Sequence, residues 1–204
     1  MTTPVRPRIL IESGKLCSGK STLTRINVEH AGFLMLTGET TRAPRTDDVK
    51  DEFRYLSDAE FDALPPEDML WATRHGAPSR YTLLRSVVDA ALADIDPETG
   101  EGRLYTRPLA PASAGKLIAE YGDVVRVIYL PSPSWSVLAE RLWTRDESPV
   151  SMASRIASEA DWDEIARNTP GICIAEGHTL QELHDEGLAL MGLPPNPLPP
   201  RAIG

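Results

Sequence analysis

The segment SGKLCSGKST at positions 13–22 contains the pattern G-x-x-x-x-G-K-[ST]. Its glycines let successive backbone N–H groups face one anion, and a helix that begins at its end adds a positive dipole. Lys20 would then reach the β- and γ-phosphates of a nucleotide, and the Ser21 hydroxyl would bind Mg²⁺. The pattern therefore predicts a nucleotide-phosphate loop made of Gly14, Lys15, Leu16, Cys17, Ser18, Gly19, Lys20, Ser21 and Thr22.

A second candidate anion site follows in the segment GETTRAPR at 38–45. Arg42 and Arg45 can each make a forked, two-bond contact with a phosphate, and neither loses its charge. Pro44 stiffens the segment, so both guanidinium groups can project to one place. An isolated R-x-x-R pair is commonly a solvated basic turn, so the assignment depends on the rest of the chain.

Strand-like and helix-like segments alternate along the chain, which favours an α/β fold with a mainly parallel sheet. Strands are expected at 8–13, 102–107, 124–130 and 171–176, and helices at 21–32, 86–95, 113–122, 134–145, from 149 onward and at 179–192. Residues 38–82 interrupt this alternation with short strand-like runs and a helix capped by Ser57 and Glu60. We interpret them as an excursion from the main sheet.

Composition limits the class of protein. Hydrophobic residues make up 41% and charged residues 25% of the 204 residues, which is ordinary globular composition at a length that suits one domain. The net charge of −9 argues against a large non-specific nucleic-acid surface. Two cysteines make no disulfide framework, and no run resembles a signal peptide or a membrane span, so a cytoplasmic protein is expected.

Taken together, these motifs resemble those of the guanylate kinase family. They occur in the same order, and the resemblance covers nearly the whole chain up to about residue 190. SGKLCSGKST is similar to that family's phosphate loop, and TTRAPR to its TTR-x-PR motif for the acceptor phosphate. The family's Y-x-F-V-S-x-x-x-F stretch is similar to FRYLSDAEF, and its (L/I)-E-W-A block to MLWATRHG. Its strand ending in PPS is similar to VIYLPSPS, and its lid to RLWTRDESPVSMASRI. The resemblance implies a three-layer P-loop NTPase fold that uses ATP and Mg²⁺.

The resemblance also implies how the chain is divided. It predicts one kinase domain over 1–192, with a core at 1–37 and 83–192, an acceptor-binding region at 38–82 and an arginine-rich lid at about 141–158. The proline-rich tail at 193–204 is expected to be extended, with no core to join.

Family positions assign roles to individual residues. Arg42 and Arg45 would hold the acceptor phosphate, and Phe53 and Tyr81 fall at tyrosine positions of the acceptor site. Arg141, Arg145 and Arg155 match lid arginines that reach the transferred phosphoryl group, and the first two also lie four residues apart on one expected helix face. Phosphoryl transfer needs positioning and charge neutralisation, so the predicted catalytic set is Lys20, Arg42, Arg141, Arg145 and Arg155.

The sequence departs from the family mainly where the acceptor base would bind. Leu70 replaces a glutamate that accepts hydrogen bonds from guanine, Phe53 lacks the tyrosine hydroxyl, and Gly38-Glu39 replaces a serine. YTRPLAP, with Arg107, stands where the family has D-x-D-x-Q-G. A site built for guanine loses these acceptors at a cost of about 1–3 kcal/mol each, so GMP is not the expected acceptor.

We therefore expect an ATP-dependent kinase acting on a (deoxy)nucleoside monophosphate or a similar phosphorylated acceptor. The alternatives are a sugar-phosphate kinase of the ribose bisphosphate type, a non-catalytic guanylate-kinase-like binding module, and a kinase acting on nucleic-acid ends. Intact Gly19, Lys20 and Ser21 argue against the binding module. The expected partners are ATP and a small phosphorylated acceptor, without nucleic acid or membrane, in a monomer or homodimer. Glu12, charged within an apolar strand, is expected to form an ion pair or to face the active site.

Overall fold

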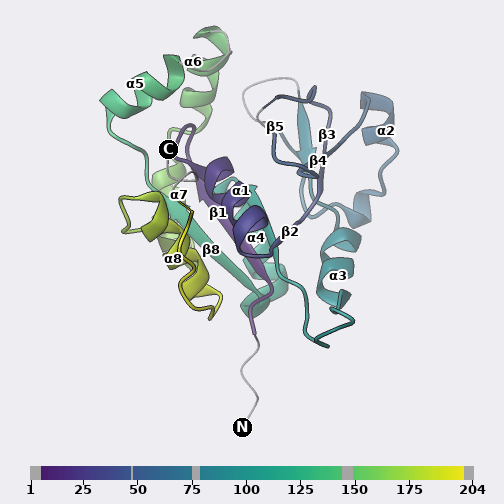
Figure 1. Cartoon of the computed structure of the whole chain (residues 1–204). Helices are drawn as coiled ribbons and strands as arrows, with labels where there is room; N and C mark the ends of the chain where they lie inside the picture. The colour runs from purple at the N-terminus through teal and green to yellow at the C-terminus, as the bar shows by residue number, and fades with distance from the viewer. Residues whose placement is uncertain (1–5, 47, 75–78, 144–148, 200–204) are drawn as a thin grey trace.

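The computed structural model of the chain describes residues 6–46, 48–74, 79–143 and 149–199. Its central sheet has five strands in the order β2 (Leu34–Met35), β7 (Tyr105–Leu109), β1 (Ile9–Gly14), β8 (Val125–Leu130) and β9 (Ile172–Ile174) (Figure 1). Every neighbouring pair is parallel. All of β1 is buried, as an interior strand covered on both faces requires. The predicted α/β fold with a mainly parallel sheet is confirmed.

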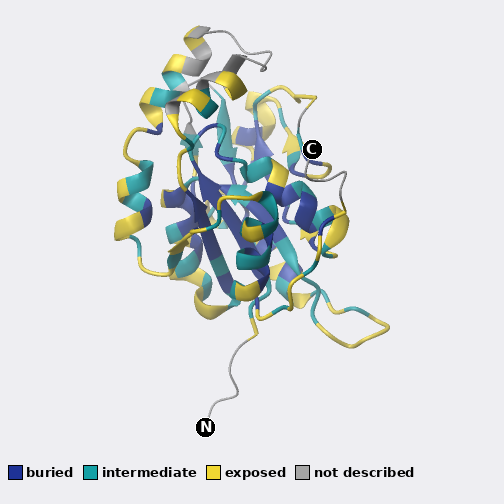
Figure 2. Cartoon of the chain, turned by 60° about the vertical axis from the view of Figure 1, so that its left-hand side comes forward, coloured by how far each residue is buried: buried dark blue, intermediate teal, exposed yellow. Residues whose placement is uncertain are grey.

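Helices cover both faces of this sheet. Successive strand residues face opposite sides, so Leu10 packs in one apolar cluster while Ile9 and Ile11 pack in another. The cluster around Leu10 includes residues of α1 (Lys20–His30) and α8 (Leu180–Leu190); the other includes residues of α3 (Arg85–Ala93) and α4 (Pro111–Tyr121). The short helices η2 (Gly122–Val124) and α7 (Trp162–Asn168) lie against α4. Figure 2 shows the burial concentrated in the central strands.

A second, smaller sheet is formed by the region at 38–82. Its order is β4 (Phe53–Tyr55), β3 (Gly38–Thr40), β6 (Arg80–Thr82) and β5 (Thr73–Arg74), with α2 (Asp58–Asp62) and η1 (Pro66–Asp68) beside it. The predicted capping box is present, since Ser57 accepts from the N–H of Glu60 and the Glu60 carboxylate accepts from that of Ser57. Trp71 of this region packs with Ile9 and Val127 of the central sheet in one cluster. The excursion therefore shares the core of the main sheet.

Two helices, α5 (Trp135–Trp143) and α6 (Pro149–Ser158), overlap the predicted lid at about 141–158 and stand above the carboxyl ends of the central strands (Figure 1). Proline is the first residue of α6, as predicted, because its missing N–H would have no helical partner there. No helix in the described ranges is long and apolar enough to cross a membrane.

The prediction that the tail has no core to join is wrong for the described residues up to Pro199. Leu198 is buried, and its N–H donates to Gln181 Oε1 at 2.7 Å. The Asn196 side chain donates to the His30 carbonyl at 2.7 Å. The tail has an apolar side chain to bury, and side chains of α8 bond the backbone groups that an extended segment leaves open. These contacts fix it beside α1 and α8.

Candidate active site

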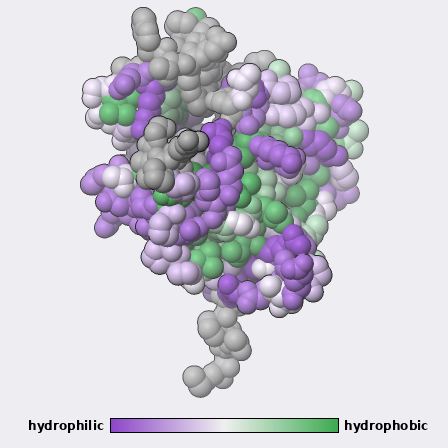
Figure 3. All heavy atoms as spheres, in the orientation of Figure 1, coloured by the Kyte–Doolittle hydropathy of each residue, from purple (hydrophilic) through white to green (hydrophobic). Residues whose placement is uncertain are grey.

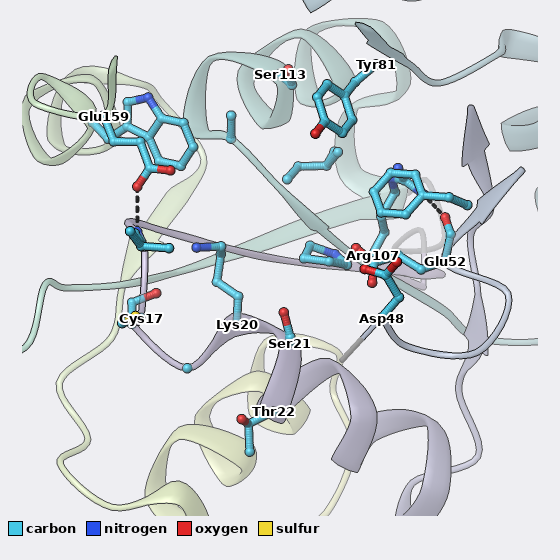
Figure 4. Close-up of a pocket in the computed structure, with 18 of the residues that line it drawn as sticks. Cys17, Lys20, Ser21, Thr22, Asp48, Glu52, Tyr81, Arg107, Ser113 and Glu159 are labelled. Atoms are coloured by element: carbon cyan, nitrogen blue, oxygen red, sulfur yellow. Dashed lines mark hydrogen bonds between the residues drawn. The ribbon is translucent and has the colours of Figure 1, made fainter. Parts of the chain in front are cut away.

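One cavity of about 700 Å³ extends from the phosphate loop to the second sheet (Figure 4). Its lining includes residues 16–22 of the loop, Arg42, Arg45 and Tyr81 of the excursion, and Arg141 from α5. The volume is within the usual range for small-molecule sites. The structure thus brings the two predicted anion sites, which are separate in the sequence, into one space.

The phosphate loop has a backbone that few side chains would permit. Gly14 (φ 147°), Cys17 (φ 60°) and Gly19 (φ 101°) all have positive φ. A Cβ at Gly14 would lie 2.5 Å from the Leu130 carbonyl oxygen and 2.6 Å from Ser18 Oγ, so only glycine fits. Ser18 Oγ is buried and has no hydrogen-bond partner within the described residues. An open donor inside a turned loop fits a ligand anion.

Lys20 and Ser21 begin α1 and both point into the cavity in Figure 4. The Lys20 ammonium donates to the Lys15 carbonyl at 2.7 Å and lies 5.9 Å from the centre of the Trp162 ring. The Lys15 ammonium is directed elsewhere, to Asp163 Oδ2 at 2.5 Å and the Ala160 carbonyl at 3.1 Å. Of the predicted loop residues, 16–22 line the cavity, whereas Gly14 and Lys15 shape and anchor the loop.

Arg42 is fixed at the cavity wall by Asp48, which the sequence analysis did not identify. The pair is forked, with Nη1 to Oδ2 at 3.0 Å and Nη2 to Oδ1 at 2.7 Å. Asp48 also accepts from the Arg45 N–H at 2.7 Å and the Tyr55 hydroxyl at 2.5 Å. Burial acts to raise the pKa of Asp48, but the hydrogen bonds from Arg42 and Tyr55 outweigh it and hold that pKa below its ordinary value.

Phe53 lies between two guanidinium groups. Its ring centre is 5.1 Å from Arg42 Cζ and 4.9 Å from Arg107 Cζ, and the Tyr81 ring stands nearly edge-on at 6.0 Å. A cation over an aromatic face is attracted by the ring quadrupole. Phe53 therefore spaces two fixed cations along the wall, although it has no hydroxyl to offer a ligand.

Arg107 crosses from the central sheet to the excursion. Its Nη1 donates to the carbonyls of Leu36 at 2.7 Å and Glu52 at 2.8 Å, and its Nε is buried without a partner among the described residues. Burial lowers the pKa of Arg107, and the charges of Glu52 and Glu39 act against that shift. A Cβ at Gly38 would collide with this guanidinium, so position 38 has room only for glycine.

Leu70, at the position where the resemblance implies a base-binding glutamate, does not line the cavity. It packs against the apolar cluster of the core, while its neighbour Trp71 lines the cavity. Adjacent residues of an extended segment face opposite sides, so only one of the two can reach the cavity. The wall at this point is aromatic, and no carboxylate comes from position 70.

The predicted lid arginines are described to different degrees. Arg141 is exposed, lines the cavity, and donates from Nη1 to the Cys17 carbonyl at 2.7 Å. Arg145 lies outside the described residues, and Arg155 lies on α6 with its side chain outside the description. The structure therefore brings one predicted lid arginine to the phosphate loop.

Among the residues that the structure describes, Glu12 has no ion-pair partner, and it does not line the cavity, which corrects both expectations for it. It is fully buried below the loop and accepts hydrogen bonds from Asn27 at 2.6 Å, Thr106 at 2.5 Å and Thr24 at 3.0 Å. Asn27 in turn bonds His184 Nδ1 at 2.9 Å. The odd charge in the strand is the centre of a buried polar network that joins β1, β7, α1 and α8.

The sequence analysis also missed Glu159 and Trp162, which line the cavity beside the loop. The Glu159 carboxylate accepts from the Leu16 N–H at 2.5 Å (Figure 4). No local pattern marks either residue; an aromatic residue in the polar segment EADWDE was the available signal.

Figure 3 shows apolar side chains gathered in the middle of the face seen in Figure 1, with hydrophilic ones around them.

Comparison with known proteins identifies the relatives of this chain. No protein-family model matches it. It is 30% identical over 182 residues to a guanylate kinase of Streptomyces coelicolor, covering 82% of this chain and 88% of that protein. It is 34% identical over 155 residues to one of Nocardia farcinica, covering 73% and 76%. The guanylate kinase of Anaplasma phagocytophilum has the same fold, with a TM-score of 0.62 at 15% identity over 92% of this chain and 85% of that one. The chain therefore belongs to the guanylate kinase family.

Proposed function

We propose that the protein transfers the γ-phosphoryl group of ATP to a (deoxy)nucleoside monophosphate or a similar phosphorylated acceptor, and that GMP is not its preferred acceptor. The observation that carries this proposal is the single cavity lined by both the phosphate loop and the Arg42–Arg45 segment. Phosphoryl transfer requires donor and acceptor phosphates to meet in line within a site of positive charge. One cavity with cations at both ends provides that arrangement.

The donor would bind at the loop. Its backbone N–H groups and Lys20 would hold the phosphates, and Arg141 lies close enough to the loop to bond its backbone. Mg²⁺ would be held by the Ser21 hydroxyl together with phosphate oxygens and water, because no group of three His, Cys, Asp or Glu side chains within the described ranges could hold a metal. The ion would neutralise charge on the phosphates during transfer.

The acceptor would bind at the second sheet. Arg42 is oriented by Asp48, Arg45 lies on the same wall, and together with Tyr81 they would hold the acceptor phosphate. Arg42, Arg141 and the lid arginines Arg145 and Arg155 are the proposed charges on the transferred group. We assign the acceptor role to 38–82, the donor role to the core and the closing role to the lid.

Selectivity against GMP is supported by what lines the acceptor end. Position 70 turns its side chain to the core, Phe53 has no hydroxyl, and Arg107 fills the space beside Gly38. Guanine presents N1–H and an amino group, which need acceptors, and unpaired buried donors cost about 1–3 kcal/mol each. Glu52 is the cavity carboxylate that could still accept from a base, and it lies beside Arg107.

The test is a coupled ADP-release assay with GMP, dGMP, AMP, CMP, UMP, dTMP and ribose phosphates at equal concentrations. Two lost bonds to buried donors predict that GMP falls about 30-fold or more below the best acceptor in kcat/KM. GMP as the best acceptor at ordinary kinase efficiency would refute the selectivity and leave the transfer reaction standing. Turnover with none of them, although ATP binds, would refute the transfer reaction itself.

A further inference from the structure

The corner between α6 and α7 contacts the phosphate loop at three places. The Glu159 carboxylate accepts from the Leu16 N–H at 2.5 Å, Asp163 Oδ2 accepts from the Lys15 ammonium at 2.5 Å, and the Trp162 ring lies 5.9 Å from the Lys20 ammonium. We call Glu159, Trp162 and Asp163 the loop clasp. All three are distant in sequence from the loop and none belongs to a phosphate-binding pattern.

The Glu159 contact is made by a carboxylate that is only 3% exposed as a residue. Removing a carboxylate from water is unfavourable unless hydrogen bonds replace its hydration. Here a backbone N–H of the loop supplies such a bond, and a charged acceptor makes it a strong one. A glutamate in this place therefore orients the loop's own main chain.

Asp163 anchors the clasp to the central sheet. Its Oδ1 accepts from the Tyr129 hydroxyl of β8 at 2.7 Å, while Oδ2 holds Lys15. Burial acts to raise the pKa of Asp163, but the hydrogen bonds from Lys15 and Tyr129 outweigh it and keep that pKa below its ordinary value. The loop is thus tied through a charged carboxylate to a strand that is itself buried.

The loop contains a strained backbone conformation that such contacts can stabilise. Cys17 occupies the left-handed region, where a residue with a Cβ is strained, and it lies next to the clasped Leu16. A conformation of this kind persists only where surrounding contacts enforce it. Loop N–H groups that already face the anion bind phosphate without a further ordering cost.

We propose that Glu159 and Asp163 are positioning residues that hold the phosphate loop in its nucleotide-binding conformation before ATP arrives. This rests on the proposed function, since it assumes that the loop binds ATP. Glu159 is also the first residue after α6, so the clasp joins the loop to the base of a lid helix.

The experiment measures the binding of ADP and of a non-hydrolysable ATP analogue by calorimetry. Glu159→Ala removes the acceptor of the Leu16 N–H and is expected to weaken nucleotide binding about tenfold, the usual worth of a hydrogen bond to a charged group. Glu159→Gln keeps an acceptor oxygen and should stay within about threefold of the unchanged protein. Glu164→Ala, an exposed glutamate on α7, is the matched control and should change nothing.

The KM of the acceptor should be unchanged in Glu159→Ala if Glu159 only positions the donor loop. A variant whose whole site is distorted would show a higher acceptor KM as well. Nucleotide binding by Glu159→Ala that equals or exceeds that of the unchanged protein would overturn the proposal, and so would equal losses in Glu159→Gln and Glu159→Ala. Asp163→Asn, which turns an amide toward Lys15, provides a second test if Glu159→Ala fails to fold, and a several-fold loss is expected. Failure of the unchanged protein to phosphorylate any acceptor bears on the proposed function, whereas the calorimetric comparisons of the variants need only nucleotide binding.

Discussion

The fully buried Glu12 predicts how stability should change with pH. Burial raises the pKa of Glu12 to about 7, and the hydrogen bonds from Thr106, Asn27 and Thr24 reduce the shift without cancelling it. Below pH 4.5 the carboxyl is protonated in both folded and unfolded chains. Between 4.5 and about 7 the unfolded chain loses this proton while the folded chain keeps it, so the free energy of unfolding falls as pH rises. Above about 7 both forms are ionised and the full penalty remains.

The size of this effect follows from the shift. Each pKa unit corresponds to 1.36 kcal/mol, so the change from 4.5 to about 7 lowers the free energy of unfolding by about 3 kcal/mol between pH 4.5 and pH 8. This is a large part of the 5–15 kcal/mol that stabilises a typical domain. His184, which shares the network through Asn27, acts in the opposite direction because burial lowers its pKa.

Glu12→Gln isolates the contribution of the carboxyl. Its carbonyl oxygen can occupy the place of Oε1 and keep the bonds from Asn27 and Thr106. Its amide can donate to the Thr24 hydroxyl, which already has a second acceptor in the Lys20 carbonyl. The network therefore survives the change while the titratable group is lost, and His184 contributes equally to both proteins.

The assay is urea denaturation of the unchanged protein and Glu12→Gln at pH 5, 6, 7 and 8. The stability of the variant relative to the unchanged protein should grow by about 2.5 kcal/mol between pH 5 and pH 8, and Glu164→Gln, at an exposed position of α7, should show no such trend. Parallel stability curves for the two proteins would show that Glu12 does not titrate abnormally, and a relative loss of the variant at high pH would reverse the sign of the reasoning.

Three further predictions concern the site and the tail. Lys20→Ala should abolish ATP turnover while the thermal melting curve stays close to the original, and turnover in a folded variant would remove this lysine from the reaction. Arg42→Ala should lower kcat/KM for the acceptor by about 10- to 100-fold, the loss of a forked charged contact, with ATP affinity unchanged; an equal loss of ATP affinity would show that the two phosphate sites are wrongly assigned. Leu198→Ala should destabilise the fold by about 2–3 kcal/mol in urea without altering kinetics, because its buried side chain packs the tail, and an unaffected midpoint would show the tail to be dispensable.

The phosphate end of the site could be predicted from the sequence because its geometry is local. A run of a few residues fixes the loop, and two arginines three apart on a stiffened segment share one wall. The contact between Arg42 and Asp48 is also local, since the two residues are six positions apart, so it could have been predicted in the same way. The strands and helices that carry these motifs also follow from apolar periodicity, and the parallel sheet was predicted correctly from their alternation.

Glu159 and Asp163 could not be predicted, because their meaning comes from a contact across more than a hundred residues. They are among 30 acidic residues, and no spacing distinguishes them. The orientation of Leu70 could not be predicted for a different reason, since motif similarity aligns positions and does not fix which side chains face the cavity. The tail was misjudged because composition alone says nothing of the partners that α8 offers.

The acceptor end of the site depends on the junction of the two sheets. Arg107 comes from a strand of the central sheet, yet its hydrogen-bond partners lie at the excursion. Leu36 precedes the excursion, and Glu52 belongs to it. Its guanidinium occupies the volume that a side chain at Gly38 would need, so the glycine and the arginine fit each other in space. A side chain added at position 38 alone would therefore collide with Arg107. Removing Arg107 alone would take a favourable charge from Glu52 and Glu39, although Glu39 would keep its ion pair with Arg54 at 3.3 Å. The two positions are therefore coupled in space, and substitutions that test the acceptor end of the site should be made at 38 and 107 together.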